Sequence, residues 1–365
     1  MGWYRVVYSM TTGLHGVVYR IAGATGSPSA AAAKAARDVL VSLFPAQTAT
    51  LDTAYANYLT ANRLTTSDPG IAVGQRAAAG VLARRANDGS YPTNPPPFVG
   101  STEAGAWRPT PSYLPGAPAS LAPMAIPWLG SVTPFTLRSP RQFRPAPHPP
   151  LNSRRYTREY DEVKSMGSFS GSNRTPEQTN LAYFWADNYP VQWNRALRAI
   201  SERHLPDHIA HSARLFALAN LAMGDAVIVA WDSKSHFNFW RPITAIQEGE
   251  NDGNPATVGN PNWQPLINTP NYPDYTSGAN NVTGACTRML ELFFGTDNVT
   301  FTVTSGVALA SPNTRTYNRF SDAADDVVDA RIYLGIHFRF ADTAARRQGT
   351  QVASWVFRRF LRPIE

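Results

Sequence analysis

The sequence contains a single cysteine, Cys286, and this scarcity excludes two kinds of site. One thiol cannot form an intramolecular disulfide, and it cannot supply the cluster of thiolates that binds structural zinc. Free cysteines are usually buried and behave as small hydrophobic residues. We therefore expect Cys286 to belong to a core rather than to act as a nucleophile.

Lysine is almost as scarce, because only Lys34, Lys164 and Lys234 occur and the other 30 of the 33 basic residues are arginine. The net charge is +7, but the arginines are scattered, and the chain has no block of five or more like charges and no recognisable DNA-binding motif. We therefore expect no nucleic-acid partner, and small anionic substrates instead. Lys234 stands out, since a compact ammonium is used there although arginine is the default.

Long apolar runs are also missing. No uninterrupted run approaches the roughly 18 residues needed to span a bilayer, and the nearest candidate, residues 226–231, is typical of a core helix. The first residues lack the charged region, apolar core and cleavage site of a secretory signal. We expect a soluble protein with no membrane span. The compartment and the oligomeric state are not predicted.

Helical patterns are frequent, whereas strand patterns are sparse. Apolar residues recur at helical spacing in residues 1–90 and again in residues 151–365, and proline or glycine closes several of these segments. The expected helices cover residues 29–44, 50–63, 70–87, 156–165, 176–185, 191–202, 206–231, 280–294 and 322–361. The fold class is therefore predicted to be all-α, with residues 1–365 forming one large helical domain.

Residues 91–150 differ from the rest, since they hold 16 of the 30 prolines. Such a composition is typical of a linker, but large apolar residues such as Trp107, Trp128 and Phe135 interrupt it. These groups are too numerous for a solvated tether. We expect an irregular but ordered segment that wraps over a core.

The most informative stretch contains Lys234 and Arg241, seven residues apart and followed by Pro242. Seven residues make nearly two helical turns, so we expect both cations on one helix face, about 10 Å apart. Proline should then end or kink the helix. The neighbours Phe239 and Trp240 indicate apolar surroundings, in which an unpaired cation is costly. An anion is therefore predicted between the two cations.

Two later segments have a similar character. Ser277 and Gly278 follow a polar loop and open a predicted helix, so a hydroxyl and backbone N–H groups would face an anion at the helix N-terminus. Further on, Arg331 and His337 lie among apolar residues. Each segment alone is more often structural than functional. Their order and spacing together carry more weight.

Three motifs follow one another along the chain. The first is lysine, six residues and Arg-Pro; the second is Ser-Gly at a helix start; the third is arginine, five residues and histidine. Together they form an ordered set. This set resembles the vanadium-dependent haloperoxidases and the related type 2 phosphatidic acid phosphatase superfamily. The likeness extends to Trp-Arg-Pro-Thr-Pro at residues 107–111 and to His-Phe-Arg-Phe-Ala-Asp at residues 337–342, which look like the soluble bacterial branch. It implies a bundle of α-helices that holds vanadate or phosphate in one pocket.

The resemblance also implies a role for each residue. Lys234, Arg241 and Arg331 would bind the equatorial oxygens of the oxyanion, and the Ser-Gly pair would add hydrogen bonds. His337 would be the axial ligand of vanadium in a peroxidase, or the nucleophile that forms a phosphohistidine in a phosphatase. In the first case the substrates would be hydrogen peroxide and a halide, and in the second a small phosphate ester without a cofactor.

One position departs from the family pattern, because Ala279 stands where a histidine normally follows Ser-Gly. That histidine is expected to move protons, which is typically worth roughly 10² to 10⁴ in rate. Asn280 and Asn281 follow, but an amide does not titrate. The sequence therefore predicts a vanadate-dependent haloperoxidase-like enzyme with lowered or altered activity. The alternatives are an acid-phosphatase-like hydrolase, a non-catalytic oxyanion binder, and a helical protein without such a pocket.

Overall fold

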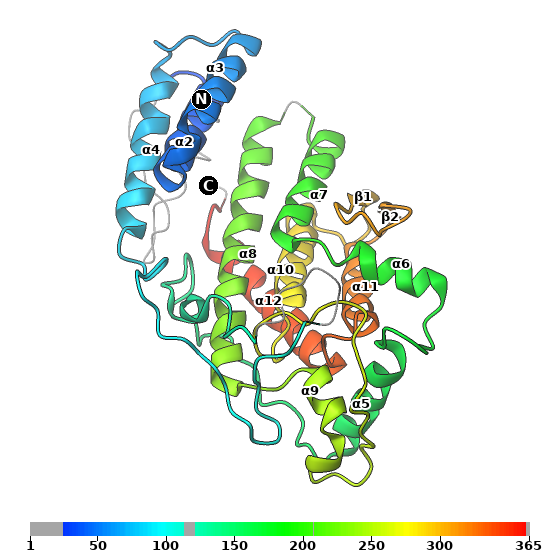
Figure 1. Cartoon of the computed structure of the whole chain (residues 1–365). Coiled ribbons are helices and arrows are strands. Elements are labelled where there is room, and N and C mark those ends of the chain that lie inside the picture. The colour runs from blue at the N-terminus through cyan, green and yellow to red at the C-terminus, as the bar shows by residue number, and fades with distance from the viewer. Residues whose placement is uncertain (1–24, 113–120, 207, 363–365) are drawn as a thin grey trace. The chain divides into compact units, whose positions relative to one another are not determined.

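A computed structural model describes residues 25–112, 121–206 and 208–362. The first residues, where no secretory signal is expected, and residues 113–120 of the proline-rich segment lie outside the described residues. Helices dominate the described part of the chain, where the strands form one two-stranded sheet (Figure 1). The all-α fold class is therefore confirmed. Cys286 is fully buried in a helix, as expected.

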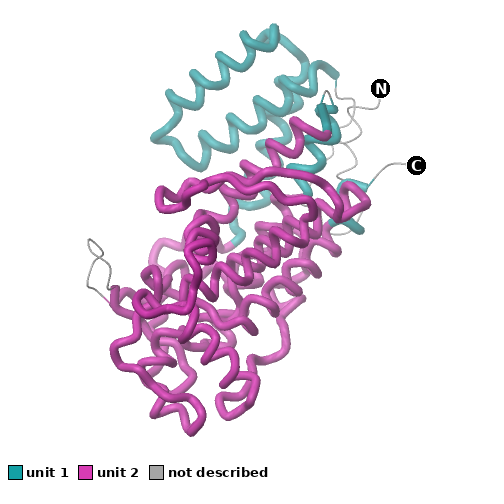
Figure 2. Tube along the Cα trace, turned by 90° about the vertical axis from the view of Figure 1, so that its right-hand side faces the viewer, with its two compact units in different colours: residues 1–88, 205–218, 357–365 teal, residues 89–204, 219–356 magenta. Residues whose placement is uncertain are grey.

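The chain divides into two compact units (Figure 2). Unit 1 comprises residues 1–88, 205–218 and 357–365, and unit 2 comprises residues 89–204 and 219–356. Helix α8 (Ile209–Phe237) begins in unit 1 and ends in unit 2, and helix α12 (Arg339–Arg359) begins in unit 2 and ends in unit 1. All candidate site residues belong to unit 2. The single domain expected from the sequence stays a prediction.

The N-terminal part of unit 1 is a set of packed helices: α2 (Pro28–Leu43), the short 3₁₀ helix η1 (Pro45–Gln47), α3 (Thr48–Ala61) and α4 (Pro69–Arg85). Asp68 caps α4 by accepting a hydrogen bond from the Gly70 backbone N–H, and it also accepts one from the Ser27 N–H. Gly74 has no side chain, and a Cβ there would overlap the carbonyl of Ala31 in α2. This glycine allows α2 and α4 to pack closely.

Unit 2 contains the other elements: η2 (Pro127–Ser131), α5 (Arg154–Met166), α6 (Pro176–Phe184), α7 (Tyr189–His204), α9 (Pro242–Gln247), η3 (Gly249–Asn251), α10 (Gly278–Phe294) and α11 (Phe320–Tyr333). Strands β1 (Phe301–Thr304) and β2 (Thr314–Tyr317) pair antiparallel, with Phe301 opposite Tyr317. Thr175 and Gln178 form a capping box at the start of α6.

The described parts of the proline-rich segment are ordered without regular secondary structure apart from η2. Trp107 is fully buried and stacks on Phe98. Asp225 of α8 accepts hydrogen bonds from the backbone N–H groups of Phe135 and Thr136, at 2.6 and 2.8 Å. The Asp225 carboxylate therefore holds in place an irregular segment that lacks the regular backbone hydrogen bonds of a sheet. The expectation of a long, irregular proline-rich segment is confirmed for these residues, whereas a wrap over a core stays a prediction.

The expectation that Lys234 and Arg241 share a helix face is wrong. Helix α8 ends at Phe237, and Asn238 has a left-handed backbone with φ of 47°. Arg241 then occupies the extended N-cap position of α9, and Pro242 is the first residue of that helix. Proline suits this position because its fixed φ matches a helix start and its missing N–H would have no partner there. Pro242 therefore opens a helix instead of ending one.

Helix α8 is the one described helix that is long and apolar enough to cross a membrane by length and composition. Its apolar window is 56% buried inside the protein, which is typical of the core helix of a soluble protein. The absence of a membrane span stays a prediction.

Candidate active site

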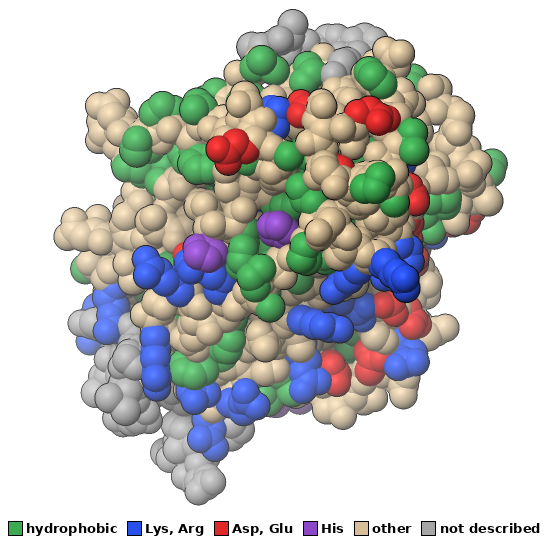
Figure 3. Space-filling view, turned by 90° about the horizontal axis from the view of Figure 1, so that it is seen from below, with side chains coloured by type: hydrophobic (Ala, Val, Ile, Leu, Met, Phe, Trp, Pro, Cys, Tyr) green, Lys and Arg blue, Asp and Glu red, His purple; other side chains and the backbone are tan. Residues whose placement is uncertain are grey.

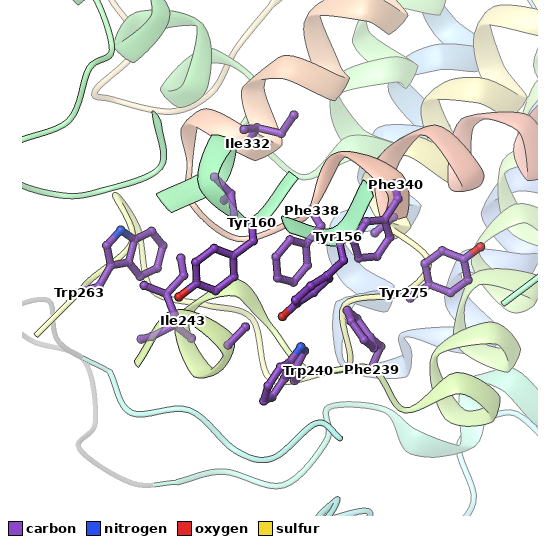
Figure 4. Close-up of a cluster of buried hydrophobic side chains, with 14 of the residues drawn as sticks. Tyr156, Tyr160, Phe239, Trp240, Ile243, Trp263, Tyr275, Ile332, Phe338 and Phe340 are labelled. Atoms are coloured by element: carbon purple, nitrogen blue, oxygen red, sulfur yellow. The ribbon is translucent and has the colours of Figure 1, made fainter. Parts of the chain in front are cut away.

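An aromatic cluster in unit 2 positions the candidate site residues (Figure 4). Four of the segments, those of Arg241, Ser277, Arg331 and His337, also contribute to this cluster a large side chain one to three residues away. These neighbours are Phe239 and Trp240 before Arg241, Tyr275 before Ser277, Ile332 after Arg331, and Phe338 and Phe340 after His337. Because cores are close-packed, the cluster fixes the backbone of four separate segments at once. The apolar surroundings expected from the sequence are confirmed.

Lys234 lies in the last turn of α8 and is completely buried. Its Nζ donates hydrogen bonds to the backbone carbonyls of Pro273, at 2.6 Å, and Asp274, at 3.2 Å. The ammonium also lies 4.8 Å from the centre of the Tyr272 ring. Burial, and secondarily the charge of Arg241, hold the pKa of Lys234 well below its usual value. A nearby anion would therefore favour the charged form of this lysine.

Arg241 is also completely buried and contacts the same loop as Lys234. Its Nε donates to the carbonyl of Tyr272 at 2.7 Å, and its Nη1 donates to the carbonyl of Ile336 at 2.6 Å. Nη1 also lies 3.1 Å from His337 Nε2. Nη2 is buried and has no hydrogen-bond partner within the described residues. Nε and Nη1 of the guanidinium thus form hydrogen bonds, whereas Nη2 forms none within the described residues.

His337 contacts Arg241 on one side and Asp274 on the other. Its Nδ1 lies 2.6 Å from Asp274 Oδ1, and both side chains are buried. Burial, together with the charges of Arg241 and Lys234, holds the pKa of His337 well below its usual value, so the ring is neutral. Burial raises the pKa of Asp274 to about 7, while Arg241 and Lys234 oppose this rise. The contact is close but is not aligned as a hydrogen bond, since Asp274 Oδ1 has no hydrogen-bond partner within the described residues. On the other side of the ring, Nε2 faces Arg241 Nη1.

Arg331 approaches from α11 and is nearly buried. Its Nη1 donates to the Tyr189 hydroxyl at 3.2 Å and to the Trp185 carbonyl at 3.4 Å, and its guanidinium lies 5.4 Å from the Tyr189 ring centre. Its Nε is buried without a hydrogen-bond partner in the described part of the chain. Arg331 is close enough to help lower the pKa values of Lys234 and His337. It therefore belongs to the same cluster of charges.

Ser277 and Gly278 form the start of α10, as the sequence predicts. Ser277 is the N-cap, and its hydroxyl oxygen accepts a hydrogen bond from the Asn280 N–H at 3.5 Å. A Cβ on Gly278 would lie 3.2 Å from the ring of Trp231, which is 5.0 Å from the Tyr272 ring between their centres. Glycine at position 278 therefore lets an aromatic wall approach the helix N-terminus.

Two buried carboxylates were not singled out by the sequence analysis. Asp274 orients His337, and Asp342 accepts a hydrogen bond from Asn280 Nδ2 at 2.7 Å and neighbours the Ser277 hydroxyl. The one available signal was an isolated acidic residue beside each motif: Asp274 precedes Ser277 by three residues, and Asp342 follows His337 by five.

The residues present suit a small oxyanion. Lys234, Arg241 and Arg331 place three cations together, and two of them, Arg241 and Arg331, carry buried N–H groups without partners in the described residues. A tetrahedral or trigonal-bipyramidal anion would satisfy such donors. Within the described residues, no group of three or more His, Cys, Asp or Glu side chains is arranged to hold a metal cation. The donor set therefore favours vanadate or phosphate over a bare metal ion.

Residues 214–365 match a family model described as the second helical-bundle domain of VCPO. This range contains all the candidate site residues. The chain is also 28% identical to vanadium chloroperoxidase from Curvularia inaequalis over 256 residues, which is 52% of this chain. The match covers 41% of the length of that relative.

Solved structures extend the likeness to nearly the whole chain. A bacterial vanadium-dependent iodoperoxidase is 25% identical, with a TM-score of 0.78 over 98% of this chain and 88% of that chain. The apo and holo forms of a bacterial vanadium-dependent chloroperoxidase share the fold at 18% identity, with TM-scores of 0.75 and 0.74. The alignments cover 97% and 98% of this chain, and 91% and 88% of those chains. The chain is therefore similar to vanadium-dependent haloperoxidases in fold over nearly its whole length, and residues 214–365 match the model of the second helical-bundle domain of VCPO.

Proposed function

We propose that this protein is a vanadate-dependent haloperoxidase-like enzyme. One observation carries the proposal: the charges of three buried cations, Lys234, Arg241 and Arg331, act on one histidine whose Nδ1 lies 2.6 Å from a buried carboxylate. Arg241 lies 3.8 Å from Asp274, but its Nη2 and the Nε of Arg331 are buried without partners within the described residues, so the site favours a bound anion. A neutral imidazole offers a lone pair that can act as a ligand, whereas an imidazolium does not.

Each residue has a separate task in this proposal. Lys234, Arg241 and Arg331 would bind the oxygens of vanadate and neutralise their charge. Ser277 and the Gly278 N–H would add hydrogen bonds from the start of α10. His337 would be the one protein ligand of vanadium, with Asp274 holding its ring and tautomer. Vanadate, when bound, supplies the centre at which hydrogen peroxide oxidises a halide.

Ala279 limits the expected rate. It is buried at the second position of α10 and has no group that can hold or move a proton. His236 is the histidine nearest to Ala279 in the sequence. It is exposed, and its ring packs on Phe237. The proposal therefore includes lowered or altered activity, by up to about the 10² to 10⁴ that general acid–base catalysis contributes.

The test is peroxide-dependent bromination of a dye by purified protein with and without added vanadate. Activity that requires vanadate is the expected result, and His337→Ala should abolish it. Calorimetry on the same samples should show that vanadate binds. A protein that binds neither vanadate nor phosphate would contradict the proposed site, and binding without bromination would leave a non-catalytic oxyanion binder.

A phosphatase is the second candidate, and the state of His337 favours it. A neutral Nε2 beside Arg241, backed by Asp274, also suits a nucleophile that accepts a phosphoryl group. Release of nitrophenol from its phosphate, inhibited by vanadate and absent in His337→Ala, would support this candidate. Bromination without any such hydrolysis would exclude it.

A further inference from the structure

Ser277, Asn280 and Asp342 form a buried polar cluster directly beside the position of the missing histidine. Asp342 Oδ1 accepts a hydrogen bond from Asn280 Nδ2 at 2.7 Å. The Ser277 N–H donates to the carbonyl of Ala341, the residue before Asp342, at 3.2 Å, and the Ser277 hydroxyl is a neighbour of this carboxyl. Asp342 Oδ2 is buried and has no hydrogen-bond partner within the described residues. Asp342 thus contacts a residue of the proposed oxyanion site and has no role in the proposal above.

The Ser277 hydroxyl has one proton to donate, and the state of Asp342 decides its direction. A carboxylate at Asp342 is a strong acceptor, so the serine proton would point toward it and away from the oxyanion. A carboxylic acid at Asp342 would instead donate its own proton to Ser277 Oγ. The serine proton would then be free to point toward the oxyanion.

We propose that Asp342 is a positioning residue that carries a proton in the working site, donates it to Ser277 Oγ, and so directs the Ser277 hydroxyl toward the bound oxyanion. This inference rests on the proposed function, because it requires an oxyanion among the three cations. It also gives the cluster a side chain that can hold a proton, which the side chain of Ala279 cannot do.

The surroundings of Asp342 support the protonated form. Burial raises the pKa of this carboxyl well above its usual range, against the hydrogen bond from Ser277, and the nearby Asp274 raises it further. A bound anion would add another negative charge and favour the proton still more. The charged and titratable groups that act on Asp342 or respond to it come from five segments: Arg331 on α11, Asp274 before α10, Lys234 on α8, Arg241 before α9 and Tyr189 on α7.

The test is calorimetric titration of the full-length protein and its Asp342→Asn variant with inorganic phosphate, between about pH 5 and pH 9. An asparagine amide donates to Ser277 at every pH, and its oxygen still accepts from Asn280. We expect similar affinities at every pH at which Asp342 carries its proton. At any pH at which it is ionised, the unmodified protein should bind about tenfold more weakly than the variant, the size of one charge-assisted hydrogen bond. The ratio of the two dissociation constants cancels the titration of phosphate itself.

Asp342→Ala is the matched control, because it also removes the charge but supplies no donor. It should bind phosphate about tenfold more weakly than Asp342→Asn at every pH. Binding by the unmodified protein that is about tenfold weaker than binding by Asp342→Asn at every pH would show an ionised Asp342 throughout and would overturn the inference alone. Absence of phosphate and vanadate binding to the unmodified protein would overturn the proposed function and, with it, this inference.

If Asp342→Asn fails to fold, Ser277→Ala provides an independent test. The Ser277 hydroxyl should strengthen phosphate binding only at pH values at which its proton points toward the oxyanion. Ser277→Ala should therefore lower phosphate affinity about tenfold wherever Asp342 carries its proton, and leave it nearly unchanged wherever Asp342 is ionised. An unchanged affinity at low pH would contradict the inference.

Discussion

Ala279 occupies the second position of α10, directly after the Ser277–Gly278 pair, and is buried. Ala279→His would place a titratable ring beside the proposed oxyanion. We expect bromination to rise by about 10² or more, because a positioned acid–base group typically contributes that much. The measurement is vanadate-dependent dye bromination. Ala279→Gln, similar in size but unable to titrate, is the control and should give no increase.

Asp274 holds His337 through the short contact between Oδ1 and Nδ1. Asp274→Asn would weaken this contact and allow the other tautomer, in which Nε2 carries the proton. Vanadate affinity should fall about 10- to 100-fold, as is typical when the partner of a ligating histidine is replaced. Asp252→Asn removes another buried carboxylate, one that binds Asn254 and Thr257 instead. Equal losses in the two variants would indicate a general structural effect.

At the level of single residues, the sequence predicts the cations and the histidine because motifs of fixed order and spacing contain them. Asp274 and Asp342 could not be predicted in the same way. Each lies near a motif along the chain, but its contact is made by a different segment: Asp274 meets His337, and Asp342 meets Asn280. Such contacts depend on long-range packing, which leaves no periodic pattern in the sequence.

Two glycines let α10 and α12 touch backbone to backbone. A Cβ on Gly284 of α10 would overlap the carbonyl of Arg346, and a Cβ on Gly349 of α12 would overlap the carbonyl of Asn281. Helix α10 carries Ser277 and α12 carries Asp342. The close crossing therefore holds the carboxyl beside the hydroxyl.

Gly349→Ala should force these helices apart. We expect the free energy of unfolding to fall by about 1–3 kcal/mol, the usual effect of overpacking. Phosphate affinity should fall as well, because Asp342 would move away from Ser277. Urea denaturation and calorimetry would measure the two effects. Gln351→Ala, at an exposed position of α12, should change neither quantity, and equal behaviour of the two variants would contradict the close crossing.

The ends of helices show where sequence patterns suffice and where they fail. The start of α10 at Ser277 was predicted, because a capping residue acts on the next three residues of the chain. The end of α8 was not, since spacing alone suggested a helix that continued to Arg241. Asn238 ends the regular path with a positive φ, and Phe239 pairs with Ala106 of the irregular segment. That bridge spans more than a hundred residues of chain and leaves no local signal.

At the scale of the whole molecule, binding of an anion should stabilise the folded protein against unfolding. Vanadate or phosphate at 100 times its dissociation constant should raise the free energy of unfolding by about 2.7 kcal/mol. Thermal denaturation with and without phosphate, at constant ionic strength, measures this effect. Arg241→Ala should lose it, whereas Arg347→Ala, which removes an exposed arginine, should keep it. Equal stabilisation of the two variants would place the anion outside the proposed site.

The net charge of +7 bears on how such an anion arrives. Lys and Arg side chains are spread across the face drawn in Figure 3. Surface charge of one sign raises the local concentration of small counter-ions and their rate of association, and salt screens this effect. The positive balance therefore fits the anionic substrates expected from composition.

The hydrogen bonds from Arg241 to the carbonyls of Tyr272 and Ile336, and from Lys234 to those of Pro273 and Asp274, have backbone atoms as partners. We expect such partners to order both side chains during folding, so that their conformational entropy is lost before an anion binds. Binding should then cost little further order, which favours tight capture of a small ion. Crystal structures with and without phosphate should superpose at these side chains within about 1 Å. A rearrangement of the cations on binding would show instead that the anion assembles its own site.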